Sequence, residues 1–317
     1  MSAGMSENDR NYAIYTAKPA WHAFGQVVQE RMSPMAMVQR VNADYDVVKC
    51  PAPVRLPNGD VADVPNQFHL VRSNDSKVVS PATVTGQYEP VCPRALASLL
   101  DPWYEQGFGT PDAFFLLFDG RKEVLTLKLD DTSKPVSDQS EWSTYFVLQN
   151  AHGRGAVTGT VTRLRAVCAN TVPTFAEWRI IHKASVHDKM EQAIRTWDKA
   201  REAIAKHNDA LDKLASRAVD IPSTVDRLLG IERTSPNAAA RVSTQKLNLR
   251  DRIVVAASTS PGVEGKTLAD IYNGLTYLAT TSGNGRGGSD PVKRMESILD
   301  GTRGRDLSGY FDTLMAM

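Results

Sequence analysis

The sequence predicts an α+β fold, in which an antiparallel β-meander with hairpins is followed by a long amphipathic helix and a helical C-terminal region. Short apolar runs separated by turn residues occupy residues 54–168, and a heptad pattern of apolar residues occupies 183–218. The 317 residues are 42% hydrophobic and 23% charged, which is ordinary globular composition. The chain therefore has enough apolar material for a sizeable core.

Four segments are expected from this pattern. Residues 1–18 indicate a flexible leader, and 19–182 indicate a β-rich α+β domain. A long helix is expected over 183–220, followed by a helical region over 221–317 with a basic, glycine-rich loop at 280–290. The polar N-terminus is unlike a signal peptide, and no apolar run reaches the roughly 20 residues that span a bilayer. A cytoplasmic protein without a membrane partner is therefore expected.

Helix and strand signals alternate in the first third of the chain. A Ser-Pro start predicts a helix over 33–41, and an Asn-Gly pair between extended segments predicts a hairpin over 54–64. The stretch 68–80 is interpreted as a second strand pair. An apolar stripe that begins at a proline and ends before glycines predicts a helix over 93–106.

The middle of the chain is rich in strand signals. The continuous apolar run at 113–118 and the alternating stretch at 122–129 are joined by an Asp-Gly turn. After a polar loop at 130–141, further strands are expected over 142–150 and 156–168. These strands follow one another closely, which predicts an antiparallel meander.

The clearest helix signal is a pair of interleaved apolar rows, in each of which residues recur every seven positions. The seam that they form is expected to pack either on the sheet or on a neighbouring subunit. The rows are Val186, Ala193, Ala200, His207 and Leu214, and Met190, Trp197, Ile204, Leu211 and Ala218.

The segment 260–267, SPGVEGKT, is similar to a phosphate-binding loop, which has the pattern G-x-x-x-x-G-K-[ST]. Its first glycine position is Ser260, and no strand with an acidic metal ligand follows. A helix start capped by Thr267, with Asp270 three residues later, is therefore favoured over nucleotide binding. Helices in this region are expected over 245–257, 267–280 and 290–300.

Metal, redox and hydrolytic chemistry find no support in the sequence. The three cysteines lack metal-ligand or redox spacing, which disfavours a zinc site and a disulfide framework and fits a reducing cytoplasm. The six histidines show no H-x-x-x-H or H-x-H pairing. His187 and Asp188 are neighbours on a helix and point in different directions. No catalytic residue, metal or cofactor is therefore expected.

The charge distribution points to a polar partner for the second half of the chain. Residues 1–150 carry 13 Lys and Arg against 18 Asp and Glu, whereas 151–317 carry 24 against 18. An ordinary solvated surface is the alternative, because a nucleic-acid footprint requires clustered charge rather than a net count.

The segment 148–172 is the most informative one for function. Its His-Gly-Arg-Gly turn exposes one cation, and the strand that follows carries two arginines two positions apart, on one face. Guanidinium groups bind phosphates in a bidentate manner, although cross-strand salt bridges are the alternative. The candidate nucleic-acid-binding residues, with cations that follow, are Arg154, Arg163, Arg165, Arg179, Lys183 and Arg286.

Five short motifs occur in an order that carries a family resemblance. They are W-H-x-x-G at 21–25, V-T-G-Q-Y-E-P-V at 84–91, and a His-Gly turn followed by R-x-V-C-x-N-T over 152–171. An aromatic step at 178–182 and Y-N-x-x-T-x-Y at 272–277 complete the set. In these motifs the chain resembles the phage/plasmid-like proteins of the "domain of unknown function 932" family. The resemblance implies a phage, plasmid or prophage context and a helix at the last motif, but no mechanism.

Single-stranded DNA binding and annealing, without catalytic residues, is the expected function. A β-β-β-α core with a basic face is also the plan of ring-forming single-strand annealing proteins, which is an analogy of fold. Such a protein holds phosphates in a positive groove while the bases stay free to pair, and a homo-oligomer extends the groove. The alternatives are a protein that regulates or antagonises a host protein through its acidic first half, and an unrecognised hydrolase or nuclease.

Overall fold

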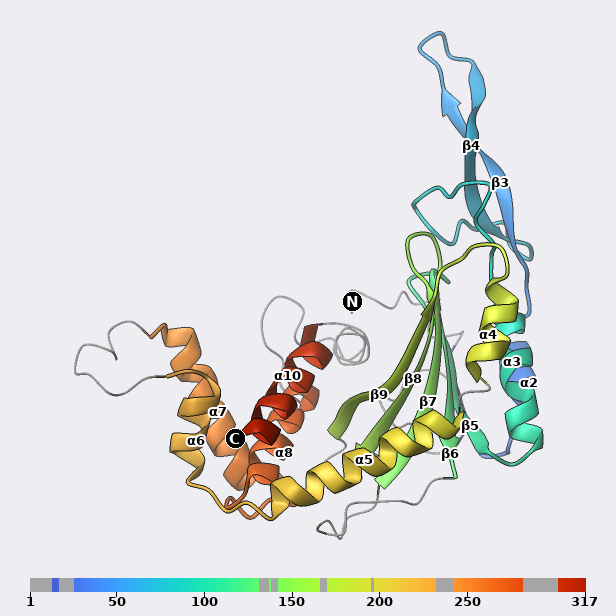
Figure 1. Ribbon diagram of the computed structural model, residues 1–317. Coiled ribbons are helices and arrows are strands. Elements are labelled where there is room, and N and C mark those ends of the chain that lie inside the picture. The colour runs from blue at the N-terminus through green and yellow to red at the C-terminus, as the bar shows by residue number, and fades with distance from the viewer. Residues whose placement is uncertain are drawn as a thin grey trace. The chain divides into compact units, whose positions relative to one another are not determined.

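The computed structural model describes most of the chain, and Figure 1 shows how its helices and strands are arranged. Both a large sheet and several helices are present, which confirms the predicted α+β fold class. The described residues are 13–16, 26–130, 137, 142–165, 170–194, 197–231, 242–281 and 302–317.

The chain divides into two compact units. The predicted boundaries near residues 182 and 220 do not separate them, because strands of the meander and the long helical stretch contribute residues to both. The first unit comprises Met1–Asp130, Tyr145–Val161 and Ala176–Lys199, and the second comprises Asp131–Thr144, Thr162–Phe175 and Ala200–Met317.

The meander predicted from the middle of the chain forms most of a seven-stranded sheet, in the order β2-β1-β5-β6-β7-β8-β9. β5 and β6 pair in an antiparallel manner, and both are buried over most of their length, which accounts for their continuous apolar sequence. The meander strands are β5 (Gly109–Leu117), β6 (Lys122–Leu129), β7 (Trp142–Ala151), β8 (Val157–Arg165) and β9 (Asn170–Ile180).

Two strands near the N-terminus extend the sheet beyond the prediction. β1 (Ala13–Thr16) pairs antiparallel with β5 and parallel with β2 (Gln26–Val28). Ile14 is fully buried. The expected flexible leader over 1–18 is therefore wrong for residues 13–16. Their apolar pattern is too short to predict a strand unless the pairing with β5 is known. The other leader residues lie outside the described part of the chain.

The Asn-Gly hairpin is confirmed. β3 (Val47–Arg55) and β4 (Val61–Arg72) form a separate two-stranded antiparallel sheet in the first unit. Gly59 in the turn has a φ of 92°, a conformation that glycine adopts without a steric penalty. In Figure 1 this hairpin projects beyond the end of the large sheet.

The predicted second strand pair over 68–80 is wrong in part. β4 continues unbroken to Arg72, and Val78 contributes an isolated bridge to Val71 rather than a strand. The Asp75 carboxylate accepts hydrogen bonds from the Arg72 guanidinium at 2.9 and 3.1 Å, which stabilises a turn directly after β4.

Local capping signals correctly identified the first helices. α2 (Pro34–Arg40) begins after Ser33, whose Oγ accepts a hydrogen bond from the Ala36 amide at 3.1 Å. α3 (Pro93–Glu105) begins at a proline and is followed by Gly107, whose φ is 71°. Both helices belong to the first unit.

The predicted long helix is observed as α4 (Val186–Ile194) and α5 (Trp197–Ala215). Residues 195–196 lie outside the described part of the chain. Ala218 is not helical, since it forms an isolated bridge with Thr267. The described seam is mostly buried inside the chain, which leaves little of it for a neighbouring subunit. Its buried members are Val186, Met190, Ile204, His207, Leu211 and Leu214.

The second unit is helical beyond α5, as predicted. Its core is apolar, and α7 and α8 approach so closely that a Cβ on Gly274 would lie 2.6 Å from the Ala257 amide nitrogen. Within the described residues, no helix has both the length and the apolar character of a membrane span. The predicted helix over 290–300 lies outside the described part. The helices are α6 (Ile221–Leu228), α7 (Thr244–Thr259), α8 (Leu268–Thr281) and α10 (Thr302–Ala316).

One acidic side chain is buried in the sheet of the first unit. Asp112 lies in β5, where the register with β6 shifts between Pro111 and Ala113. It is 8% exposed, and its Oδ2 has no hydrogen-bond partner among the described residues. Burial raises the pKa of Asp112 to about 7, and the charge of Lys128 opposes this rise.

We expect Asp112→Asn to stabilise the protein at pH 8 and to have little effect at pH 4. The folded protein favours the protonated Asp112 carboxyl more than the unfolded chain does. Asp112 therefore destabilises the folded protein least below its ordinary pKa of 3.8, and this stability is lost as the pH rises through 7. The free energy of unfolding in urea should rise by roughly 1–3 kcal/mol at pH 8. Asp209→Asn, at an exposed position, is the control and should change stability little. A less stable Asp112→Asn protein at pH 8 would contradict the assignment.

Candidate functional site

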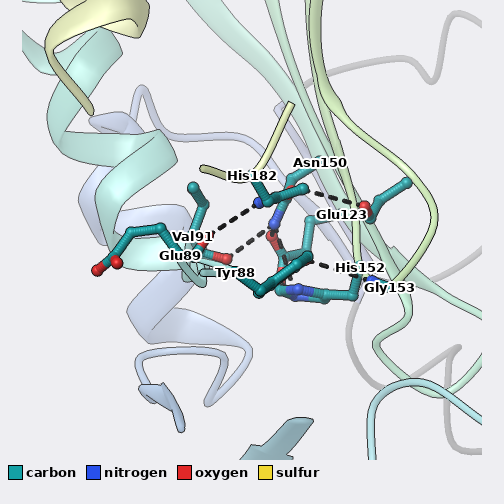
Figure 2. A network of polar contacts seen from close by, with 9 residues as sticks. Tyr88, Glu89, Val91, Glu123, Asn150, His152, Gly153 and His182 are labelled. Carbon is teal, nitrogen blue, oxygen red and sulfur yellow. Dashed lines mark hydrogen bonds and ion pairs between the residues drawn. The ribbon is translucent and has the colours of Figure 1, made fainter. Parts of the chain in front are cut away.

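Three segments that carry the motifs singled out in the sequence meet in the first unit (Figure 2). They are residues 84–91, the turn at 152–156 between β7 and β8, and His182 just after β9. The β5–β6 turn at 118–121 joins them, since the His152 amide donates to the Arg121 carbonyl at 2.9 Å. We call this region the turn end of the sheet.

The centre of the turn end is a buried pair of titratable side chains. His152 Nε2 lies 3.0 Å from Glu123 Oε1, and both side chains have 0% exposure. Asn150 Nδ2 donates to Glu123 Oε2 at 2.7 Å and to the Val91 carbonyl at 2.8 Å. Each carboxylate oxygen thus has a donor, which is the condition under which a buried carboxylate is tolerated.

A second histidine links this pair to the segment 84–91. The ring nitrogens of His182 each lie 3.2 Å from a backbone carbonyl, that of Glu89 on one side and that of Ala151 on the other. The ring stacks on Tyr88 at a centroid distance of 4.7 Å, and the Tyr88 hydroxyl accepts from the Gly153 amide at 3.3 Å. Burial and, less strongly, the neighbouring His152 lower the pKa of His182 to about 4.

These contacts make the network a support for the turns. Its side chains are buried. Gly153 has a φ of 76°, and a Cβ there would lie 2.5 Å from Ser80 Oγ, so the turn requires glycine. Within the described part of the chain, no group of three or more His, Cys, Asp or Glu is placed to hold a metal ion.

Several cations on the same segments are exposed to solvent. Of the residues expected to bind nucleic acid, Arg154, Arg179 and Lys183 are exposed at the turn end. Arg121 on the β5–β6 turn is a fourth exposed cation, with its guanidinium 4.8 Å above the Phe118 ring. Sequence analysis missed Arg121, although the Asp-Gly turn that carries it was recognised. We call Arg121, Arg154, Arg179 and Lys183 the turn-end cations.

The turn-end cations form no ion pair with any described residue. Two acidic side chains of the turn end are exposed, Glu89 on the segment 84–91 and Asp119 on the β5–β6 turn. The segments of the turn end thus carry four exposed cations and two exposed acidic residues.

The prediction that Arg163 faces outward is wrong. Arg163 is fully buried in the second unit, where its guanidinium donates to Asn208 Oδ1 on α5 and lies 4.7 Å from the Trp142 ring. An amide oxygen and an aromatic face are favourable neighbours for a buried guanidinium. Burial and, less strongly, the positive charge of Arg163 lower the pKa of His207 to about 3.

The structure does not place the other two candidate side chains. The side chain of Arg165 and the whole of Arg286 lie outside the described part of the chain. Trp21, His22 and Cys168, which carry parts of the family-like motifs, lie outside it too.

The segment 260–267 caps a helix, as favoured from the sequence. The Asp270 carboxylate accepts hydrogen bonds from the amides of Glu264, Lys266 and Thr267, at 3.2, 2.9 and 3.0 Å. A phosphate loop presents such amides to its ligand. Here the chain's own carboxylate occupies them, so the nucleotide-binding alternative loses its support.

Comparison with known proteins gives one match. The family model described as a domain of unknown function (DUF932) matches residues 82–273, which is more than half of the chain. The matched range contains the buried network and all the turn-end cations. No curated protein and no solved structure matches the chain.

We expect Glu123→Ala to destabilise the protein by about 3–5 kcal/mol, because it leaves His152 and the Asn150 amide buried without their acceptor. Urea unfolding at pH 7 measures the change. Glu89→Ala is the matched control: its side chain is exposed, and its contact with His182 is made by the backbone, so its effect should stay within about 0.5 kcal/mol. Equal effects of the two substitutions would show that the buried pair contributes no special stability.

The stability of the protein should fall as pH falls from about 6.5 to 4. In the unfolded chain His182 is protonated near its ordinary pKa of 6.5, whereas in the folded protein it is protonated only near pH 4. The resulting loss is on the order of 3 kcal/mol, complete below pH 4. His182→Gln should flatten this pH dependence, whereas His187→Gln at an exposed position should leave most of it. An unchanged slope in His182→Gln would count against the assignment.

Proposed function

Because the chain belongs to the DUF932 family, whose description assigns no activity, we propose a function from its own geometry: it binds single-stranded DNA at the turn end of the sheet and anneals complementary strands there. The observation that carries this proposal is the group of exposed turn-end cations, which lack ion-pair partners among the described residues.

The turn-end cations suit a phosphate backbone. Three of the four are arginines, whose planar guanidinium groups bind phosphate oxygens through two parallel hydrogen bonds. They lie at one end of the sheet, with Arg121 on the β5–β6 turn, Arg154 on the β7–β8 turn, and Arg179 and Lys183 at and after the end of β9. A DNA strand that runs across this end contacts the four cations one after another. The cations can bind its phosphates without first breaking an ion pair to a described residue.

The buried network below supplies the rigidity that this surface needs. Glu123 and His152 fix the two turns that carry Arg121 and Arg154, so little side-chain and backbone entropy is left to lose on binding. Contacts to phosphates position a strand and leave its base edges unread. Bases that stay free can pair with a second strand, and such a process needs no catalytic residue.

The proposal predicts that a variant with all four turn-end cations changed to alanine binds single-stranded DNA weakly. Each phosphate contact to a single strand contributes roughly −0.7 to the slope of log K against log salt concentration. The slope should therefore become shallower by about 3 in the variant. Fluorescence anisotropy of a labelled oligonucleotide at several salt concentrations measures it.

A control variant with the same change in charge separates this surface from a general effect of net charge. It replaces three arginines and one lysine that are exposed in the second unit, namely Lys213, Arg217, Arg227 and Arg305, by alanine. The control should retain the wild-type slope and the wild-type rate of annealing of two complementary labelled oligonucleotides. If the control loses as much binding as the turn-end variant, or if the wild-type protein binds no single strands, the proposal fails.

A further inference from the structure

The β5–β6 turn holds three consecutive residues in the left-handed region of the backbone. Residues 118–121 make up the whole connection between the two strands. The φ angles of Phe118, Asp119 and Gly120 are 55°, 58° and 86°. Glycine adopts such an angle without penalty and aspartate tolerates it, whereas a bulky side chain adopts it rarely. The phenylalanine is therefore the unusual residue of this turn.

Burial in the core does not account for a phenylalanine at this position. The side chain of Phe118 is only half-buried, whereas that of Leu117, the last residue of β5, is 1% exposed. Asparagine or glycine fits a left-handed position with less strain. Backbone strain of this kind persists mainly at ligand-binding sites, active sites and switch regions. The aromatic ring thus points to a role at the surface of the turn.

Contacts with the rest of the first unit fix the backbone of the turn. The Arg121 amide donates to the Phe118 carbonyl at 3.3 Å, and the Arg121 carbonyl accepts from the His152 amide at 2.9 Å. Gly120 is packed so closely that a Cβ there would lie 3.2 Å from the hydroxyl of Tyr45, which is 1% exposed. The protein beneath the turn therefore maintains its strained conformation.

One of the turn-end cations lies over the strained phenylalanine. The guanidinium carbon of Arg121 is 4.8 Å from the centroid of the Phe118 ring, a distance at which the cation and the ring attract one another. Arg121 is nevertheless exposed. A guanidinium donates hydrogen bonds from its edge and stacks with its face, so it can contact a phosphate and a flat ligand together. We call Phe118 and Arg121 the stacking pair.

An unpaired nucleobase is the kind of ligand that the stacking pair suits. Proteins that bind single strands stack bases on aromatic rings and on guanidinium planes, beside cations that contact the phosphates. Stacking uses the face of a base and leaves its pairing edge free, which is compatible with annealing. In a duplex, neighbouring base pairs already cover both faces of a base. The stacking pair therefore favours a single strand, although phosphates are present in both forms of DNA.

We infer that the stacking pair binds the face of one unpaired base of the DNA strand at the turn end. This inference rests on the proposed function, because it adds a base contact to the phosphate contacts of the same surface. It goes beyond that function in naming a residue without charge, Phe118, as a binding residue. Since every base has a flat face, the contact does not select a particular sequence.

Two labelled oligonucleotides of equal length test the inference by fluorescence anisotropy at one salt concentration. One carries bases, and the other consists of abasic sites throughout, so it offers phosphates alone. Wild-type protein should bind the first more tightly. Phe118→Asn should weaken binding of the first roughly 5- to 150-fold and leave binding of the second unchanged. Phe118→Tyr keeps a ring and should bind both like the wild type. The melting temperature of Phe118→Asn should stay the same or rise, because asparagine tolerates the left-handed backbone.

Phe108→Asn is the matched control. It removes a phenylalanine that is 44% exposed and lies directly before β5, at the opposite end of that strand from the turn, and it should bind both oligonucleotides normally. Equal binding of the two oligonucleotides by the wild type overturns the inference and leaves the proposed function standing. A Phe118→Asn protein that loses affinity for both alike, or for neither, or that melts at a much lower temperature, overturns it too. Wild-type protein that binds neither oligonucleotide overturns the proposed function as well.

Discussion

The buried contact between Glu123 and His152 is the interaction on which the rest of the turn end depends. A carboxylate with 0% exposure persists because His152 and Asn150 each give one of its oxygens a donor. The same histidine holds the β5–β6 turn through its backbone amide, which donates to the carbonyl of Arg121. One buried contact thus fixes two turns, and each of these turns presents an arginine to solvent.

Local signals in the sequence predicted local structure well. The cap at Ser33 and the turn at Asn58–Gly59 are correct because a few neighbouring residues determine them. β1 was missed because its stability comes from pairing with β5, about a hundred residues away in the sequence. Arg163 was misplaced for a related reason. Alternation identifies residues that share one face of a strand, but it does not identify the helix that covers this face.

The candidate site was predicted in part. The His-Gly turn and the cation that follows it lie at the turn end of the sheet, where Arg154, Arg179 and Lys183 are exposed, and their role in DNA binding stays a prediction. The partner of His152 was not foreseen. Glu123 alternates with apolar residues at the start of a strand, a pattern typical of a surface charge, and it lies 29 positions from the histidine. Its role follows from tertiary packing alone.

The central claim concerns the turn-end cations. Photo-crosslinking of a bromouracil-containing oligonucleotide, followed by mass spectrometry of the crosslinked peptides, tests it most directly. The account predicts crosslinks in peptides that contain residues 118–123, 152–156 and 179–183. Crosslinks confined to the second unit would contradict it.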